Sequence, residues 1–219
     1  KQEFDLKEVK RDDTALETAK RFDEGMFLEK PVASLDLRLL PDAIQALENN
    51  NLGVALRTLS ATSPVKRVQQ IAARFDKVVG TTKVQVLDSL EPTLGREASG
   101  FFEPETNTIF INRNTGMNAH TLLHEMGHAV TSASIAENKS SPTTKQLQTI
   151  FNTVREQIGE VYGTRNLDEF VSEALSNPQF QSALASIRVD SDRTSLWSKL
   201  RDSFKKILRR ALRLPPTSA

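Results

Sequence analysis

The sequence predicts an α+β fold that is mostly helical, with a small antiparallel sheet directly before a helix that carries every histidine of the chain. Three observations support this prediction. Apolar residues recur at helical spacing over most of the chain. Strand-like alternation occurs only between residues 83 and 113. The three histidines then follow at intervals of four in "HTLLHEMGHAV", residues 120–130, which places them on one face of a helix.

Helices are expected before the sheet. The pattern over 12–27 predicts one helix that ends near Gly25, and that over 41–63 predicts two short helices joined at an Asn-rich turn. A further helix is expected over 63–80, because apolar residues line one face and a glycine ends the stretch.

The sheet is expected from two short segments. Val84 and Val86 alternate with polar residues within 83–89, which is typical of a half-buried strand. The stretch "GFFEPETNTIFINR", residues 100–113, predicts a hairpin whose turn is formed by residues 104–107.

Helices are expected again after the histidines. They cover 143–161, 166–177, 178–187 and an amphipathic, basic stretch over 195–214. We therefore divide the chain into an N-terminal helical part (1–62), a core (63–190) and a basic C-terminal helix docked on the same domain (191–219).

Composition narrows the possible classes of protein. The 219 residues, with 38% hydrophobic and 26% charged, suit a globular domain, and no apolar run reaches the ~18 residues of a membrane helix. The absence of cysteine excludes disulfides, thiolate metal sites and cysteine nucleophiles. The N-terminus shows no signal peptide, so the localisation stays unknown, with a phage virion or a host cytoplasm as candidates. A start on Lys rather than Met favours a processed product or a piece of a longer chain.

Charge is unevenly distributed. Residues 193–213 hold eight basic residues and one acid, so this segment carries +7 and the rest of a chain of net charge +1 carries −6. Such a segment could bind nucleic acid or an anionic membrane surface. The competing interpretation is a docked helix with its charges in water, and we favour it.

The histidine helix contains the pattern H-E-x-x-H. His124 and His128 lie one turn apart and can point at one ion, while Glu125 stands beside the site as a general base. The metal expected for this pattern is Zn²⁺, which acidifies water and polarises a carbonyl. His120 lies about 12 Å from His128 along a helix, so we expect it to line the cleft or to hydrogen-bond a group behind the ligands. Gly127 indicates either close packing or room for a substrate.

These motifs resemble those of zincin metallopeptidases. In zincins a strand before the motif helix receives the substrate as an added strand, which here implies residues 107–113, with Thr108, Ile109, Phe110 and Ile111 as substrate-binding residues. Zincins also often use a tyrosine or histidine to stabilise an oxyanion. Tyr162, the only tyrosine, is the candidate, with simple packing as the alternative.

The subgroup that fits is the gluzincins. Metzincins need Gly and His where this chain has Thr131 and Ser134, and peptide deformylases need a cysteine ligand. Gluzincins take a third ligand from a downstream Glu-x-x-Ser/Ala-Asp/Glu, which "EFVSE" matches. The resemblance implies that Glu169 binds the metal and that Glu173 accepts a hydrogen bond from a ligand histidine. The alternative for Glu169 is a helix-capping role with Asn166.

A wider resemblance covers most of the chain. The segments "NNLGVALRTLS", "GFFEPETNTIFINR", "HTLLHEMGHAV", "DEFVSEALSNPQFQ" and "SLWSKL" resemble, in that order, the HExxH peptidase-like domain of large bacteriophage and mobile-element polyproteins. The resemblance implies a zinc endopeptidase acting on a polypeptide, with the parent polyprotein as one candidate substrate. Two alternatives remain: a virion structural or interaction module with weak activity, and a nucleic-acid-binding module that uses the basic C-terminal helix.

Overall fold

The computed structural model describes residues 38–94, 98–137 and 139–189, and in addition 194–195, 199–200, 202–203 and 206. The helix expected over 12–27 lies outside the described residues. So does most of the basic helix expected over 195–214, and its docking and its binding to nucleic acid therefore stay predictions.

Three helices open the described part: α2 (Pro41–Glu48), α3 (Leu52–Thr62) and α4 (Lys66–Asp76). The two helices predicted within 41–63 are thereby confirmed. Asn51 sits at their junction, and its side chain accepts a hydrogen bond from the backbone N–H of Val54 at the start of α3. These helices pack by their apolar faces, and Phe75 of α4 is completely buried.

The sheet has three strands: β1 (Lys83–Leu87), β2 (Gly100–Glu103) and β3 (Thr108–Asn112). A short helix, α5 (Glu91–Leu94), follows β1. The strand order is β1-β3-β2, with β2 antiparallel to β3 as the hairpin predicts, and β1 parallel to β3. The predicted α+β class and the sheet before the histidine helix are confirmed, but the sheet is mixed rather than antiparallel. After β1 the chain runs in the opposite direction as β2 at the far edge and then turns into β3, which lies between them and runs in the same direction as β1.

The position of β3 corrects one expectation. Residues 107–113 were expected to offer a free edge to substrate, yet β3 pairs with β1 on one side and with β2 on the other. The backbone groups of Thr108, Ile109, Phe110 and Ile111 are therefore committed to the sheet, and these residues are not the substrate-binding edge. Among the described residues, the unpaired edge of the sheet on the hairpin side belongs to β2.

The C-terminal half is helical: α6 (Ala119–Glu137), α7 (Pro142–Ile158), the 3-10 turn η1 (Tyr162–Thr164), α8 (Leu167–Ser176) and α9 (Pro178–Ser186). Two short strands, β4 (Arg188–Val189) and β5 (Thr194–Ser195), pair with each other. The side chains of Ser141, Asn166 and Asn177 accept hydrogen bonds from the first-turn amides of α7, α8 and α9.

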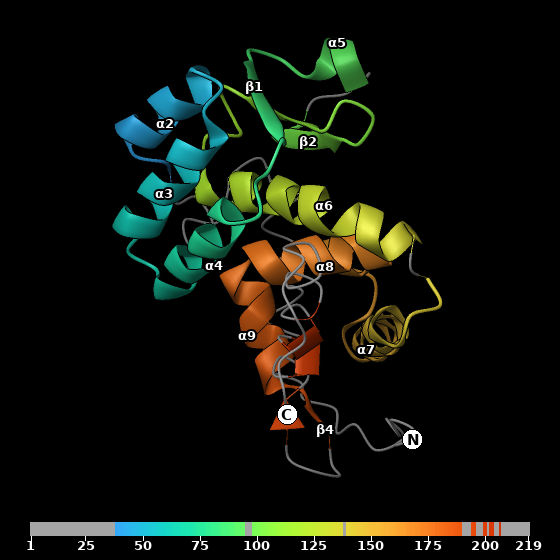
Figure 1. Ribbon diagram of the computed structural model, residues 1–219. Coiled ribbons are helices and arrows are strands. Elements are labelled where there is room, and N and C mark those ends of the chain that lie inside the picture. Colours follow the sequence, from blue (N-terminus) through green and yellow to red (C-terminus); the bar gives the residue numbers. More distant parts are fainter. Residues whose placement is uncertain are drawn as a thin grey trace.

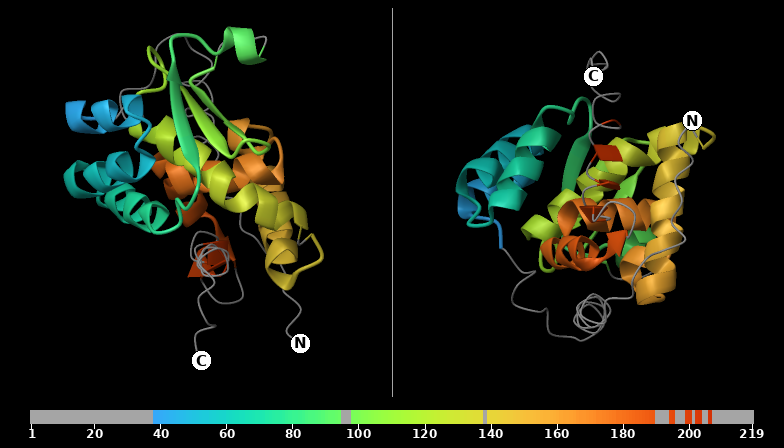
Figure 2. Two further views of the ribbon diagram at one scale, coloured as in Figure 1. Left: turned by 45° about the horizontal axis from the view of Figure 1, so that its top comes forward. Right: turned by 90° about the horizontal axis from the view of Figure 1, so that it is seen from below.

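Helix α6 lies at the centre of the part of the chain that the structure describes. The sheet lies on one side of it and α8 on the other, and α2, α3 and α4 flank this stack (Figure 1; Figure 2). Among the α6 side chains, Leu122, Leu123 and Met126 are completely buried. None of the helices in the described residues is long and apolar enough to span a membrane.

Candidate metal centre

The histidines form a ladder along one face of α6. The ring centroids of His120 and His124 are 5.6 Å apart, and those of His124 and His128 are 4.8 Å apart. The His124 side chain is buried, while His120 and His128 stay partly exposed. The Nε2 atoms of His124 and His128 lie 3.1 Å apart, so these two imidazoles converge on one point.

Helix α8 brings a carboxylate to the same point. Oε2 of Glu169 lies 3.2 Å from Nε2 of His124 and 3.6 Å from Nε2 of His128. The two helices can approach this closely because Gly127 faces Ser172: a Cβ atom at position 127 would lie 2.9 Å from the Ser172 hydroxyl oxygen. Of the two interpretations of Gly127, close packing is the correct one.

The three atoms fit a single metal ion. Ligand atoms at about 2.1 Å from a tetrahedral ion stand about 3.4 Å from one another, and the three separations of 3.1, 3.2 and 3.6 Å bracket that value. Oε2 of Glu169 is also buried without a well-directed hydrogen bond. A buried carboxylate oxygen needs a partner, and a cation between the three atoms would provide one.

The same packing shifts the protonation of these groups. Burial alone would lower the pKa of His128, but its hydrogen bond to Asp168 and the nearby carboxylate of Glu169 raise the pKa to about 9. Burial likewise opposes the charged form of His124, whose pKa the carboxylates of Glu169 and Glu173 nevertheless raise well above its ordinary value. The two histidines in turn hold the pKa of Glu169 well below its ordinary value, against the effect of burial. These interactions therefore favour protonated histidines beside an ionised Glu169.

A carboxylate stands behind each of the two histidines. Oε1 of Glu173 lies 3.0 Å from Nδ1 of His124, and Oδ2 of Asp168 lies 2.8 Å from Nδ1 of His128. Such a carboxylate fixes the tautomer and the orientation of an imidazole whose Nε2 binds a metal. The Asp168 oxygens also accept a hydrogen bond from the hydroxyl of Ser132 at 2.8 and 2.9 Å.

Sequence reasoning missed Asp168. It precedes Glu169 in the first turn of α8. An acidic residue is common there because it interacts favourably with the helix dipole, so its presence did not indicate a role at the site. Its partner Ser132 continues the i, i+4 series of His124 and His128, and this hydroxyl is the feature of the sequence that could have indicated a partner on another helix.

The sequence also allows Glu169 to be part of a helix cap. Asn166 accepts a hydrogen bond from the Glu169 backbone N–H, while the Glu169 carboxylate points to the histidines.

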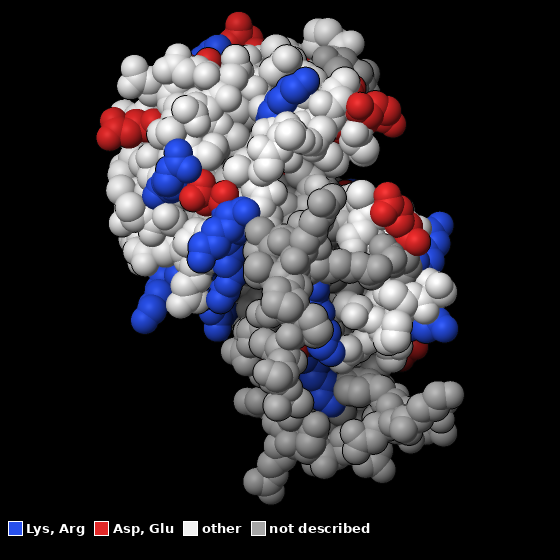
Figure 3. Space-filling model, viewed as in Figure 1, with Lys and Arg blue, Asp and Glu red and all other residues white. Residues whose placement is uncertain are grey.

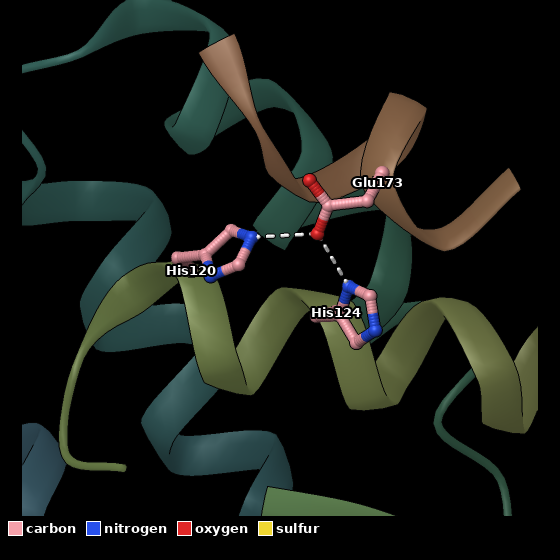
Figure 4. Close-up of side chains that lie close together, drawn as sticks. All are labelled: His120, His124 and Glu173. Carbon is pink, nitrogen blue, oxygen red and sulfur yellow. Dashed lines mark hydrogen bonds and ion pairs between the residues drawn. The ribbon is translucent and has the colours of Figure 1, made fainter. Parts of the chain in front are cut away.

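His120 belongs to a second cluster. Its Nε2 lies 2.9 Å from Oε1 of Glu173, the oxygen that also faces His124 (Figure 4). His120, His124 and Glu173 also have ligand atoms within 4.8 Å of one another, so they form a second group that could hold a metal. The group with Glu169 is the better candidate, because Oε1 of Glu173 already accepts a hydrogen bond and the Glu173 side chain is completely buried.

Glu125 lies between the histidine ladder and β2. Its side chain is buried, and burial raises its pKa, although the neighbouring histidines act in the opposite direction. A Cβ atom at Gly100 would lie 3.1 Å from Cγ of Glu125 and 2.8 Å from Cγ2 of Thr121. Strand β2 therefore passes directly over Glu125, and the glycine makes this close approach possible.

Tyr162 reaches the same region from η1. Its ring centroid is 5.9 Å from that of His124, and the Arg165 guanidinium lies 4.8 Å from the centre of the tyrosine ring. Burial, followed by the negative charges of Glu169, Glu173 and Glu125, raises its pKa far above the ordinary value, so the hydroxyl keeps its proton.

The structure thus brings most of the predicted site residues together: His120, His124, Glu125, His128, Tyr162, Glu169 and Glu173. The strand residues behave differently. Thr108, Ile109 and Ile111 are buried, and Phe110 stacks on Phe101 with ring centroids 4.7 Å apart. They support the sheet above α6.

Comparisons of the chain with family models, with curated proteins and with solved structures each gave no match. The case for function therefore depends on the geometry of this buried His/Glu cluster, which could hold a metal ion.

Proposed function

We propose that this domain is a zinc-dependent peptidase of the gluzincin kind, with His124, His128 and Glu169 as metal ligands. The observation that carries the proposal is the triangle formed by the two Nε2 atoms and the Glu169 carboxylate oxygen, with Glu125 buried beside it. Two imidazoles and one carboxylate form the ligand set of many catalytic zinc sites, which leaves a position for water or substrate. Zinc bound there would supply Lewis acidity that acidifies water and polarises a carbonyl group.

Glu125 is the general base of the proposed reaction. It takes a proton from the attacking water and passes it to the nitrogen of the departing amine, so the peptide bond breaks without net proton uptake. Its raised pKa suits this exchange, because a base that is too weak cannot accept the proton. Glu125 is not part of the ligand triangle, which leaves its carboxylate free for this task.

Tyr162 is proposed to stabilise the oxyanion. Its hydroxyl stays protonated, as a hydrogen-bond donor must, and its ring lies beside that of His124. The contact with Arg165 holds the ring on one side and adds positive charge near it.

Substrate is proposed to pair with the free edge of β2 in place of β3. Strand β2 lies over Glu125, and its edge opposite β3 has no partner strand among the described residues. In the antiparallel ladder, Asn112 N–H donates to the Ser99 carbonyl. Because every second residue of a strand faces the same neighbour, the backbone groups of Phe101 and Glu103 also face β3. The backbone groups of Gly100 and Phe102 then point outward, where an extended peptide could bind them.

On the face shown in Figure 3, side chains of both charges are present. Acidic and basic side chains are interspersed over its upper part, and basic ones gather over α4, which carries Lys66, Arg67 and Arg74. The class of substrate proposed, a polypeptide in extended form, is supported by the β2 edge, where main-chain groups are available for pairing. Kinship with the peptidase-like domains of bacteriophage polyproteins is a further part of the proposal and adds the parent polyprotein as a substrate to test.

The test combines metal analysis with a peptide-library assay on the full chain. Wild-type protein should hold one zinc per chain and should cleave peptides. Glu125→Gln should keep the zinc and lose about 100-fold or more in hydrolysis. The matched control is Glu137→Gln, since Glu137 is exposed at the end of the same helix. A zinc-loaded wild type that cleaves no peptide, or a Glu125→Gln variant as active as wild type, would refute the proposal.

A further inference from the structure

The Glu173 carboxylate contacts more side chains than it would need to orient His124 alone. Its side chain is completely buried, yet three nitrogen atoms surround its carboxylate. Oε1 lies 2.9 Å from Nε2 of His120 and 3.0 Å from Nδ1 of His124 (Figure 4), and Oε2 accepts a hydrogen bond from the Asn177 side-chain amide at 2.7 Å.

The two imidazoles do not share Oε1 equally. His120 makes a well-directed hydrogen bond to it. Nδ1 of His124 is almost equally close but makes no well-directed hydrogen bond, so this contact is a close ion pair without hydrogen-bond geometry. The orientation of the Glu173 carboxylate is therefore set by His120 and Asn177, and His124 meets an oxygen that is already held.

Both outer partners are themselves fixed. Asn177 caps α9 by accepting hydrogen bonds from the backbone N–H groups of Gln179 and Phe180, so its side-chain amide has little freedom. His120 extends from the first turn of α6, the helix that also carries His124. The carboxylate from α8 is thus held at one oxygen by α6 and at the other by the start of α9.

We propose that His120 is a positioning residue of the metal centre: by donating a hydrogen bond to Oε1 of Glu173, it holds that carboxylate where it orients His124 toward the metal. His124 is held with Nδ1 toward Glu173 and Nε2 toward His128 and Glu169. This inference depends on the metal site of the proposed function and not on the peptidase step.

The hydrogen bond from His120 limits the rotation of the Glu173 carboxylate. Without His120, Oε1 of a completely buried carboxylate would have only the poorly directed contact with His124. The carboxylate could then turn to improve that contact, and the imidazole would turn with it. Outer partners of this kind change metal affinity by about 10- to 100-fold.

The experiment compares His120→Leu with His120→Gln in the full chain. Zinc dissociation constants are measured by competition with a chelator, and the side-chain nitrogen signals of the histidines are recorded by NMR in metal-free protein. His120→Leu should weaken zinc binding by about 10- to 100-fold and move the His124 signals. His120→Gln retains an N–H donor at a similar reach and should recover most of the affinity. A merely structural role would lower the melting temperature of metal-free protein without changing the zinc affinity of the folded fraction.

A double-mutant cycle shows whether His120 acts through Glu173. In a Glu173→Gln background, His120→Leu should have little further effect on zinc affinity, because the oxygen that His120 holds has lost its charge. Unchanged zinc affinity in His120→Leu, or an equal loss in both backgrounds, would overturn the inference alone. A wild type that binds no zinc would overturn the proposed function and this inference together.

Discussion

Gly127 of α6 and Ser172 of α8 form the point of closest approach between the two helices that carry the candidate site. A Cβ atom at 127 would lie 3.0 Å from the Ser172 Cα atom. The site residues stand at matched distances from this point: His124 and Glu169 come three residues before it on their helices, and His128 and Glu173 come one residue after. A single close approach therefore places His124 opposite both glutamates and His128 opposite Glu169.

This contact makes Gly127→Ala a test of how the site is built. Alanine favours an isolated helix by about 1 kcal/mol over glycine, but here its Cβ would push against backbone. We expect a net loss of about 1–3 kcal/mol in the free energy of unfolding, measured with urea, and weaker zinc binding as the helices separate. The control is Gly53→Ala in α3, where the new Cβ meets mainly the flexible Arg57 side chain. Equal stability changes in the two variants would contradict this account.

The ligand assignment predicts that substitution of Glu169 weakens zinc binding more than substitution of Glu173. Glu169→Ala removes one corner of the triangle and should abolish most zinc affinity, whereas Glu173→Ala should cost about 10- to 100-fold. Zinc titration of each variant gives the answer, with Glu156→Ala, an exposed change on α7, as the control. If Glu173→Ala were the more damaging change, the metal would lie in the group with His120 instead.

Asp168 should matter although no motif marks it. Asp168→Asn keeps the size of the side chain but weakens its hydrogen bond with Nδ1 of His128, so we expect about 10- to 100-fold weaker zinc binding. Ser132→Ala removes only the hydroxyl that supports Asp168 and should have a smaller effect. Cobalt substituted for zinc would report the same change in its visible spectrum. Identical spectra and affinities for wild type and Asp168→Asn would exclude a role for this residue.

The local parts of this structure could be predicted from the sequence, and the parts set by packing could not. The histidine ladder follows from spacing on one helix, and the Asn51 and Asn166 caps follow from residue type at a helix start. The central position of β3 depends on its parallel pairing with β1, which lies more than twenty residues away in sequence. No alternation pattern within 100–113 carries that information, so the edge was assigned to the wrong strand. The link between His120 and Glu173 spans 53 residues and depends in the same way on how α6 meets α8.

The β2 edge can be tested by amide hydrogen exchange. A peptide-like inhibitor with a zinc-binding group should slow exchange at the N–H groups of Gly100 and Phe102, which face outward. The N–H groups of Phe101 and Glu103 already pair with β3 and serve as an internal control. Slowing confined to residues 108–111, or absent from β2, would show that substrate lies elsewhere.

Zinc uptake should release protons. The pKa of His128 in the metal-free fold is about 9 rather than the ordinary 6.5, and that of His124 is also raised. The charged form of His128 therefore stabilises the metal-free fold fully below about pH 6.5 and loses this effect as the pH rises through about 9. Zinc needs neutral imidazoles, so at pH 7 its binding must displace protons from this pair of histidines.

The apparent zinc affinity should consequently rise as the pH increases to about 9, and the stabilisation of the fold by zinc should rise with it. Titration calorimetry in buffers that differ in ionisation enthalpy counts the protons released for each ion bound. We expect at least one at pH 7, because the raised pKa values of His124 and His128 favour charged imidazoles before binding, and neither is charged afterwards. His128→Ala should lower the count along with the affinity, whereas substitution of an exposed acid such as Glu156 should leave both unchanged. A count of zero, with affinity independent of pH, would mean that these histidines do not bind the ion.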